Sequence, residues 1–191
     1  MVISNGNMEV DYVLKRNGEY EEMSFEKVLN RIKKLSVLNN SSLNVNPTKV
    51  TQQVCSQINN NIPTNKIDEL AAQLCASMAT EHPDYIKLAS HITISNLHKE
   101  TSPSFSETIR ILYDNKDIHG IKSPLISDKL YAIVEKNKTK LNSYLLRKEN
   151  RDYNIDYFGL KTLEKSYLIK VEGKIVERPQ YLFMRVALGI H

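Results

Sequence analysis

The chain has 191 residues, of which 41% are hydrophobic and 25% charged, as in a soluble globular protein with room for one larger domain or two small ones. Its formal net charge of +4 suits a phosphate-bearing small ligand and does not demand nucleic acid. No apolar run reaches the roughly 20 residues of a membrane helix, no secretory signal is visible, and the two cysteines form no CxxC motif, which argues against a disulfide scaffold and a zinc module.

The N-terminal part predicts a loose arm followed by a β-hairpin. Residues 1–10 are polar and carry few apolar anchors. In YVLKRNGEYEEMSFEK, two short extended runs flank Asn17-Gly18, a pair that suits the two φ > 0 positions of a type I′ turn. The turn places Lys15 and Arg16 together, either as an anion clamp or as two solvated surface charges.

Helical spacing begins directly after the hairpin. Ser24 predicts an N-cap for a helix over 25–35, and a loop is expected over 39–44. Asn46-Pro47 predicts the start of a second helix that runs to about residue 60.

Two more helices are predicted before a domain boundary near residue 102. Thr64 is expected to cap the third helix, and Cys75 lies on its apolar face as a small core residue. His82-Pro83 opens the fourth, which runs to about Lys99, a position where the helix dipole alone favours a cation. Before the boundary the chain therefore forms a compact ββαααα unit.

Beyond the boundary the pattern predicts further helices and a second hairpin. The expected elements are a short helix with Phe105, Ile109 and Leu112, helices over about 127–144 and 160–166, a hairpin around Glu172-Gly173, and a helix from Pro179. The last helix shows no ending by residue 191, so we expect a continuation of the chain or another subunit to cover its apolar face.

The residues that could bind an anion come from separate predicted elements. Lys15 and Arg16 offer charge, the helix that starts near Thr64 offers backbone N–H groups, and Lys99 ends the fourth helix. Asp68 either accepts hydrogen bonds from a sugar or an adenine, or is a surface acid that complements the helix dipole. Without a P-loop, a GxGxxG motif, a catalytic triad or a metal-ligand cluster, the sequence favours a regulatory or binding unit.

Several long blocks resemble one family. VLKRNGEYEEMSFEKVLNRI and IDELAAQLCASMATEHPDYIKLASHITISNLHKET resemble the ATP cone, the nucleotide-sensing domain at the start of many ribonucleotide reductase large subunits. DYFGLKTLEKSYLIK and ERPQYLFMRVALGIH resemble the helical region before the catalytic barrel of class I large subunits. The resemblance implies a mainly α fold, with an ATP cone over 11–102 and the start of the reductase helical region over 103–191. The flexible arm over 1–10 precedes the part that it covers.

The resemblance also implies a ligand and a site. ATP would bind as an activator and dATP as an inhibitor of ribonucleoside diphosphate reduction, with Mg²⁺ accompanying the nucleotide and no metal site in the chain itself. The residues implied are Lys15, Arg16 and Lys99 at the triphosphate, Glu21, Glu26 and Lys27 along the nucleotide, and Thr64 and Asp68 beside the base and sugar. Glu19 stands where many relatives carry Arg, which removes a positive charge near the phosphates.

The implied partners are the rest of the large subunit with its catalytic barrel, the small radical-generating subunit, and further copies of the chain at full length, in the cytoplasm and without nucleic acid or membrane. Because the family's reactive cysteines lie in the barrel and neither Cys55 nor Cys75 matches them, we expect these 191 residues alone to reduce no ribonucleotide. Two alternatives are a stand-alone ATP-cone regulator, which would add a zinc ribbon, and a docking fragment that binds no nucleotide.

Overall fold

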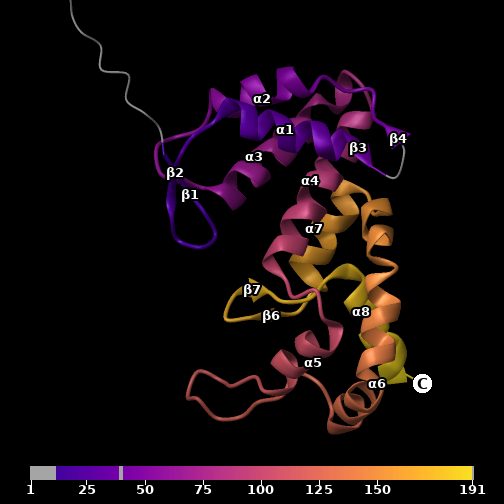
Figure 1. Cartoon of the computed structure of the whole chain (residues 1–191). Coiled ribbons are helices and arrows are strands. Elements are labelled where there is room, and N and C mark those ends of the chain that lie inside the picture. Colours follow the sequence, from indigo (N-terminus) through magenta and orange to yellow (C-terminus); the bar gives the residue numbers. More distant parts are fainter. Residues whose placement is uncertain (1–11, 39–40, 191) are drawn as a thin grey trace, which may run out of the picture. The chain divides into compact units, whose positions relative to one another are not determined.

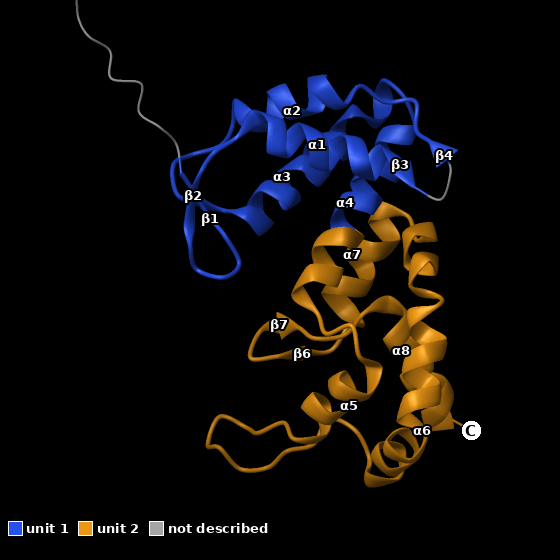
Figure 2. Ribbon diagram, in the orientation of Figure 1, with its two compact units in different colours: residues 1–93 blue, residues 94–191 orange. Residues whose placement is uncertain are grey.

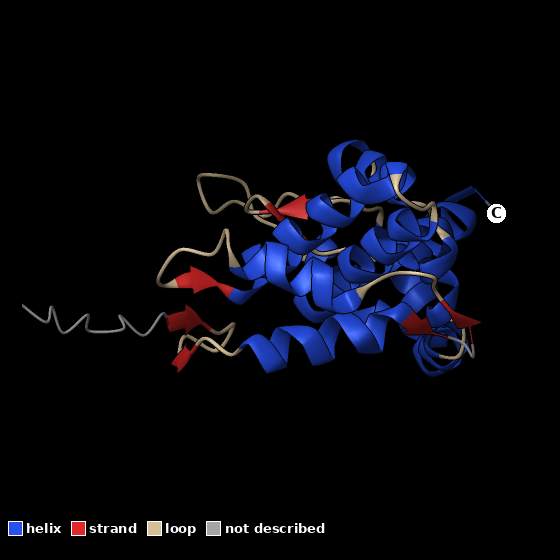
Figure 3. Ribbon diagram, turned by 90° about the horizontal axis from the view of Figure 1, so that it is seen from above, coloured by secondary structure: helices blue, strands red, loops and turns tan. Residues whose placement is uncertain are grey.

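The structure is a computed structural model that describes residues 12–38 and 41–190, and its chain divides into two compact units, residues 1–93 and 94–191 (Figures 1 and 2). Helices dominate both units and the strands are short (Figure 3), so the predicted mainly α fold is confirmed. Helix α4 (Asp84–Glu100) runs through the division and contributes to both units. None of the described helices combines the length and the apolar character needed to cross a membrane. The arm expected over 1–10 lies outside the described residues.

Unit 1 begins with the predicted hairpin, extended by a third strand. Strands β1 (Tyr12–Leu14) and β2 (Tyr20–Glu22) pair antiparallel, and β5 (Ile62–Pro63) pairs parallel with β1. The two-residue β5 was not predicted, because a strand this short has no periodicity to detect. It leads directly into helix α3 (Thr64–Ser77), so the start of this helix lies beside the hairpin.

The turn of the hairpin differs from the type I′ turn predicted. Lys15 N donates to Glu19 O (2.8 Å) and Gly18 N to Lys15 O (3.0 Å), which encloses a three-residue loop. Only Gly18 has a positive φ (85°), as in three-residue loops that end in a left-handed glycine. The Asn17 carboxamide supports the loop instead, since its Oδ1 accepts a hydrogen bond from Glu19 N (3.1 Å).

Side-chain caps start the next two helices, as predicted. Ser24 Oγ accepts from Lys27 N (3.4 Å) at the start of α1 (Phe25–Ser36). Asn46 Oδ1 accepts from Lys49 N (3.1 Å) at the start of α2 (Pro47–Cys55). Each cap satisfies a backbone N–H that the helix itself leaves without a partner.

Helix α2 ends at Cys55 and not near residue 60, which corrects the predicted boundary. The residues that follow bind the hairpin: Asn60 Oδ1 accepts from Tyr12 N (2.9 Å), and Asn61 N donates to Tyr12 O (2.7 Å). Asn61 adopts φ 64°, a conformation that Asn tolerates better than most residues. The chain thus leaves the helix in order to form β5.

The loop expected over 39–44 is partly a strand pair. β3 (Val37–Leu38) and β4 (Ser41–Ser42) pair antiparallel, while residues 39–40 lie outside the described part of the chain. The polar composition of this stretch is typical of a loop, and two-residue strands lie within the range that composition cannot resolve.

Helix α3 starts one residue earlier than the predicted cap at Thr64 implies. Pro63 occupies the N-cap position, no side chain caps the helix, and Thr64 is the first helical residue. The extended backbone of Pro63 (φ −63°, ψ 139°) belongs to β5, which fixes the helix start. The 3₁₀ turn η1 (Met78–Thr80) then connects α3 to α4.

The core of unit 1 is built from the apolar faces of its helices. Cys75 is fully buried there, as predicted, and this burial raises the pKa of its thiol to about 12. The other buried apolar residues of unit 1 include Ile32, Leu35, Val50, Val54, Ile67, Ala71, Met78, Leu88 and Ile92.

Unit 2 contains the helices and the hairpin predicted for it. The helices are α5 (Phe105–Tyr113), α6 (Asp128–Leu146), α7 (Tyr157–Ser166) and α8 (Pro179–Ile190), with the 3₁₀ helix η2 (Glu149–Asn154) and strands β6 (Lys170–Val171) and β7 (Lys174–Ile175). Helix α7 starts three residues before its predicted start, because Asp156 Oδ1 caps it through Gly159 N (2.9 Å). Glu172 and Gly173 both have φ > 0 at the tip of the hairpin.

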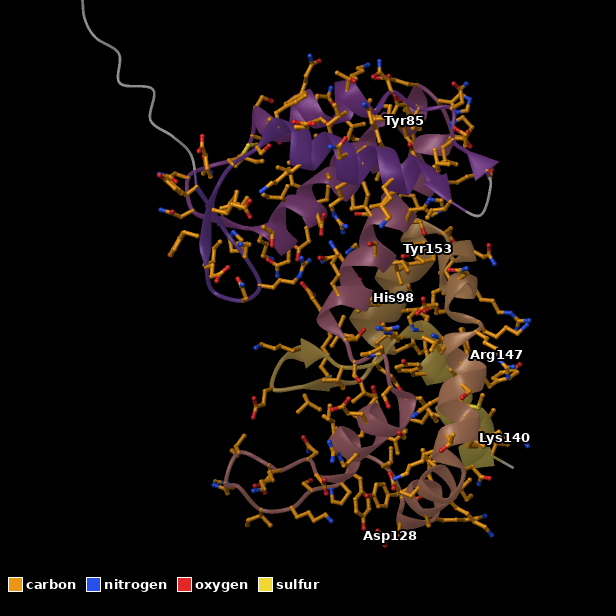
Figure 4. The ribbon with its side chains drawn as sticks, viewed as in Figure 1. Tyr85, His98, Asp128, Lys140, Arg147 and Tyr153 are labelled. Atoms are coloured by element: carbon orange, nitrogen blue, oxygen red, sulfur yellow. The ribbon has the colours of Figure 1, made fainter. Side chains whose placement is uncertain are left out.

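A network of buried hydrogen bonds lies at the C-terminal end of α4, within unit 2. The guanidinium of Arg178, 3% exposed, donates to the carbonyls of His98 (3.0 Å) and Thr101 (3.2 Å). His98 Nε2 lies 2.8 Å from Asp152 Oδ2, and its ring lies edge-on to that of Tyr153 with centroids 5.7 Å apart. Figure 4 labels His98 and Tyr153. The last turn of α4 is therefore an integral part of the core of unit 2.

Candidate functional site

Charged side chains from three elements of unit 1 meet in one place. We call this group, which contains four cations and three carboxylates, the charged cluster. It draws on the β1–β2 hairpin, α1 and α3, and its members are Lys15, Arg16, Glu19, Glu21, Lys27, Arg31 and Asp68.

The lysines of the charged cluster share carboxylates on the hairpin. Lys15 Nζ lies 3.0 Å from Glu19 Oε2 and 3.5 Å from Glu21 Oε2, and Lys27 Nζ pairs with the other oxygen of Glu21. Hydrogen bonds from Asn17 and then from Lys15 lower the pKa of Glu19 below its usual value. Because these groups are largely exposed, their pairing is weak and readily exchanged.

The arginines of the charged cluster converge on Asp68, which is only 6% exposed. Arg31 Nε and Nη2 donate to its two oxygens at 2.6 and 2.9 Å, and Arg16 Nη2 donates to Oδ2 at 3.3 Å. Asp68 is therefore a buried carboxylate with several hydrogen-bond donors. It is not the surface acid that the sequence offered as one of its two interpretations.

Arg31 was missed in the sequence analysis, although a signal for it exists. It lies four residues after Lys27, which places both cations on one side of α1. Arg31 also directly precedes Ile32, which is only 2% exposed, so Arg31 lies next to the buried face of α1. A single cation within an amphipathic helix is common, however, and only the fold brings it to Asp68.

The remaining predicted residues of unit 1 lie around the charged cluster. Thr64 is the half-buried first residue of α3, and the pairing of Leu14 with Pro63 brings this helix start beside the hairpin. Its positive end has no side-chain cap. Glu26 is exposed in the first turn of α1 and takes part in none of the ion pairs of the charged cluster.

Lys99 lies in the last turn of α4, where it is exposed and belongs to unit 2. The structure therefore brings together Lys15, Arg16, Glu21, Lys27 and Asp68 through direct ion pairs, with Thr64 next to them, and leaves the part played by Lys99 as a prediction from the sequence.

The charged cluster presents cationic donors of the kind that bind anions. The side chains of Lys15, Arg16 and Arg31 are 37%, 32% and 26% exposed, and that of Lys27 is 68% exposed, so all four cations are at least partly accessible to solvent. A polyanion can replace the carboxylates as their partner, since phosphate oxygens accept charge-assisted hydrogen bonds equally well. Within the described residues, no three His, Cys, Asp or Glu side chains come together to hold a metal ion.

A separate polar hollow of about 340 Å³ lies on unit 2, between α5 and α6. None of the predicted site residues contributes to it. Its lining consists of Ser106, Glu107, Arg110, Tyr131, Glu135 and Lys138.

Comparison with known protein families identifies two segments of the chain. Residues 11–100 match the ATP cone domain, and residues 153–191 match the ribonucleotide reductase all-alpha domain. The first segment contains the entire charged cluster, and the second contains α7, the β6–β7 hairpin and α8.

Curated relatives are similar over almost the whole chain. The ribonucleoside-diphosphate reductase large subunit of Arabidopsis thaliana is 49% identical over 181 residues, which cover 94% of this chain and 22% of that protein. The large subunits of Plasmodium falciparum and Monkeypox virus are 48% and 47% identical, again over 94% of this chain and over 22% and 23% of their own lengths. The chain thus spans less than a quarter of the length of these relatives.

Proposed function

Residues 11–100 belong to the ATP cone domains and residues 153–191 to the ribonucleotide reductase all-alpha domains, and from this premise we propose that the chain is an adenine-nucleotide sensor of a ribonucleoside-diphosphate reductase large subunit. ATP cone domains bind nucleotide effectors that regulate these reductases. The all-alpha segment favours this role over that of a stand-alone regulator, because residues 153–191 match a ribonucleotide reductase domain.

The observation that carries the proposal is the charged cluster itself. Its four cations are accessible to solvent from a hydrogen-bonded turn and from one helix, beside the positive end of α3, which has no side-chain cap. Phosphate groups are favoured at such a helix end, and lysine and arginine donors add charge-assisted hydrogen bonds. The alternative of a docking fragment that binds no nucleotide does not explain why four accessible cations lie together.

The proposed roles are those that the resemblance to the ATP cone implies. Lys15 and Arg16 bind the triphosphate, with Lys99 as a further contact, while Lys27, Glu21 and Glu26 line the nucleotide. Thr64 and Asp68 lie beside the base and sugar. Mg²⁺ accompanies the phosphates of the nucleotide. When the phosphates form ion pairs with the lysines, Glu19 and Glu21 lose these partners and are solvated by water instead.

We propose ATP as the activating ligand and dATP as the inhibiting one. The two differ by a single hydroxyl group, so discrimination requires different contacts in two states of assembly. At full length this places the chain in the cytoplasm with the rest of the large subunit, the small radical-generating subunit and further copies of itself, away from nucleic acid and membranes.

Calorimetric titration of the 191-residue chain with Mg²⁺–ATP tests the proposal. Lys15→Ala removes a charge-assisted hydrogen bond of about 1.5–3 kcal/mol, so the affinity should fall about tenfold or more. Lys99→Ala is expected to weaken binding to a similar extent.

The matched control is Lys49→Ala, which removes an equal charge in unit 1. Lys49 pairs with Glu81 at 2.8 Å on the surface and lies outside the charged cluster. Its variant should bind ATP as the parent does. An unchanged affinity in Lys15→Ala, or an equal loss in Lys49→Ala, would contradict the proposed site.

A further inference from the structure

Asp68 has two arginine partners that are geometrically unequal. Arg31 binds it side-on with Nε and Nη2, one atom to each oxygen, at 2.6 and 2.9 Å. Arg16 reaches one oxygen with a single nitrogen at 3.3 Å. Bidentate arginine–carboxylate pairs are stronger and more precisely oriented than single long contacts. Arg31 therefore provides most of the compensation for the charge of Asp68.

The burial of Asp68 makes this compensation necessary. With 6% of its surface exposed, the carboxylate obtains little stabilisation from water, and a buried charge that loses its partner is strongly unfavourable. The two other cations of the charged cluster pair with different carboxylates, Lys15 with Glu19 and Glu21 and Lys27 with Glu21. Among the ion pairs of the described residues, those of Asp68 are formed with Arg31 and Arg16.

We propose that Arg31 is a positioning residue of the nucleotide site, which holds Asp68 so that Arg16 can exchange its carboxylate contact for a phosphate of the nucleotide. This inference rests on the proposed function. Arg16 lies on the hairpin turn next to Lys15 and makes the weaker of the two arginine contacts with Asp68. It can leave Asp68 without leaving a buried charge unpaired, because the two bonds from Arg31 remain.

The exchange predicts the effect of replacing Arg31 by an uncharged residue. Arg16 is then the remaining arginine partner of Asp68. When Arg16 binds a phosphate instead, the buried carboxylate is left unpaired, which is strongly unfavourable. Removal of Arg31 should therefore weaken nucleotide binding through Asp68. If the carboxylate is removed as well, this cost disappears and Arg31 becomes dispensable.

A double-mutant cycle measured by calorimetry with Mg²⁺–ATP tests the inference. Arg31→Gln in the otherwise unchanged chain should lower the affinity about tenfold. In the Asp68→Asn background, the same Arg31→Gln change should alter the affinity less than about twofold, since the two substitutions couple only if they act through one contact. Lys34→Gln removes the same charge from the exposed last turn of α1 and should leave the affinity unchanged in either background.

A second measurement excludes a merely structural effect. Each variant is checked by circular dichroism and thermal unfolding, and Arg31→Lys, which keeps the charge but loses the bidentate geometry, should fall between the parent and Arg31→Gln in ATP affinity. An equal loss from Arg31→Gln in both backgrounds, or no loss in the parent background, would overturn the inference and leave the proposed function intact. Failure of the parent chain to bind ATP would overturn both.

Discussion

Lysine and arginine have different tasks within the charged cluster. The lysines form solvent-accessible pairs with Glu19 and Glu21, of a kind that contributes little to stability and is screened by salt. The arginines meet a buried carboxylate, where their planar guanidinium groups fit both oxygens. The lysines are therefore available to a ligand at small cost, while the Arg31–Asp68 pair maintains the arrangement around them.

His91 gives unit 1 a dependence on pH. Its Nδ1 donates to the carbonyl of Leu35 at 2.9 Å, and burial lowers the pKa of the ring below its usual value. A lowered pKa in the folded state means that this group stabilises the fold above about pH 6.5, the value of a free histidine, and that the contribution is lost as the pH falls through the folded pKa.

We expect the melting temperature of the chain to decrease between pH 7 and pH 5.5. His91→Gln keeps a hydrogen-bond donor but does not titrate, so its melting temperature should decrease less over the same interval. Thermal unfolding followed by circular dichroism provides the comparison. An identical pH dependence in parent and variant would show that His91 does not cause it.

Individual site residues could be predicted from the sequence where they lie within or beside a recognisable local motif. Lys15 and Arg16 stand next to an Asn-Gly pair, and Asp68 lies near a helix start, so sequence reasoning could select them. The Arg31–Asp68 pair joins residues 37 positions apart, and no local pattern specifies such a contact. The same reason explains why the sequence left open whether Asp68 is buried or exposed.

At the level of elements, the hairpin turn positions the cations of the site. Gly18 has φ 85° and closes the three-residue loop that presents Arg16, with Lys15 as the residue just before it. In this left-handed conformation an alanine costs about 1–2 kcal/mol, even though nothing lies within 4 Å of the added Cβ. The conformation of this one residue therefore bears on both stability and binding.

Gly18→Ala should lower the free energy of unfolding by about 1–2 kcal/mol and weaken ATP binding, because the strained turn no longer holds Lys15 and Arg16 in place. Chemical denaturation and calorimetry measure the two effects. Gly189→Ala is the matched control: Gly189 lies in α8, also has open space around it and has no positive φ. Retention of full stability in Gly18→Ala would contradict the assigned turn.

The elements that sequence reasoning recovered are those with strong local signals. Ser24, Asn46 and the apolar spacing behind each of them specify α1 and α2, and Glu172-Gly173 specifies the second hairpin. β5 and the early end of α2 depend instead on pairing with Tyr12 and Val13, nearly 50 residues earlier. Tertiary pairing decides these boundaries, and local propensity does not.

At the scale of the whole molecule, two compact units share one helix. The first half of α4 contributes Leu88 and Ile92 to the buried residues of unit 1, whereas Ile94 and Leu97 pack with Leu160 in unit 2. Arg178 then binds the carbonyls of His98 and Thr101 at the end of this helix. The covalent path between the units is thus a continuous helix whose end is fixed by buried hydrogen bonds.

The most direct test of the account is an NMR titration of the ¹⁵N-labelled 191-residue chain with Mg²⁺–ATP. The account predicts saturable shifts centred on the amides of residues 14–31 and 62–68, which contain the hairpin turn, the start of α1 and the start of α3. It would be contradicted by the absence of saturable shifts, or by shifts confined to unit 2, such as those of residues around the hollow between α5 and α6.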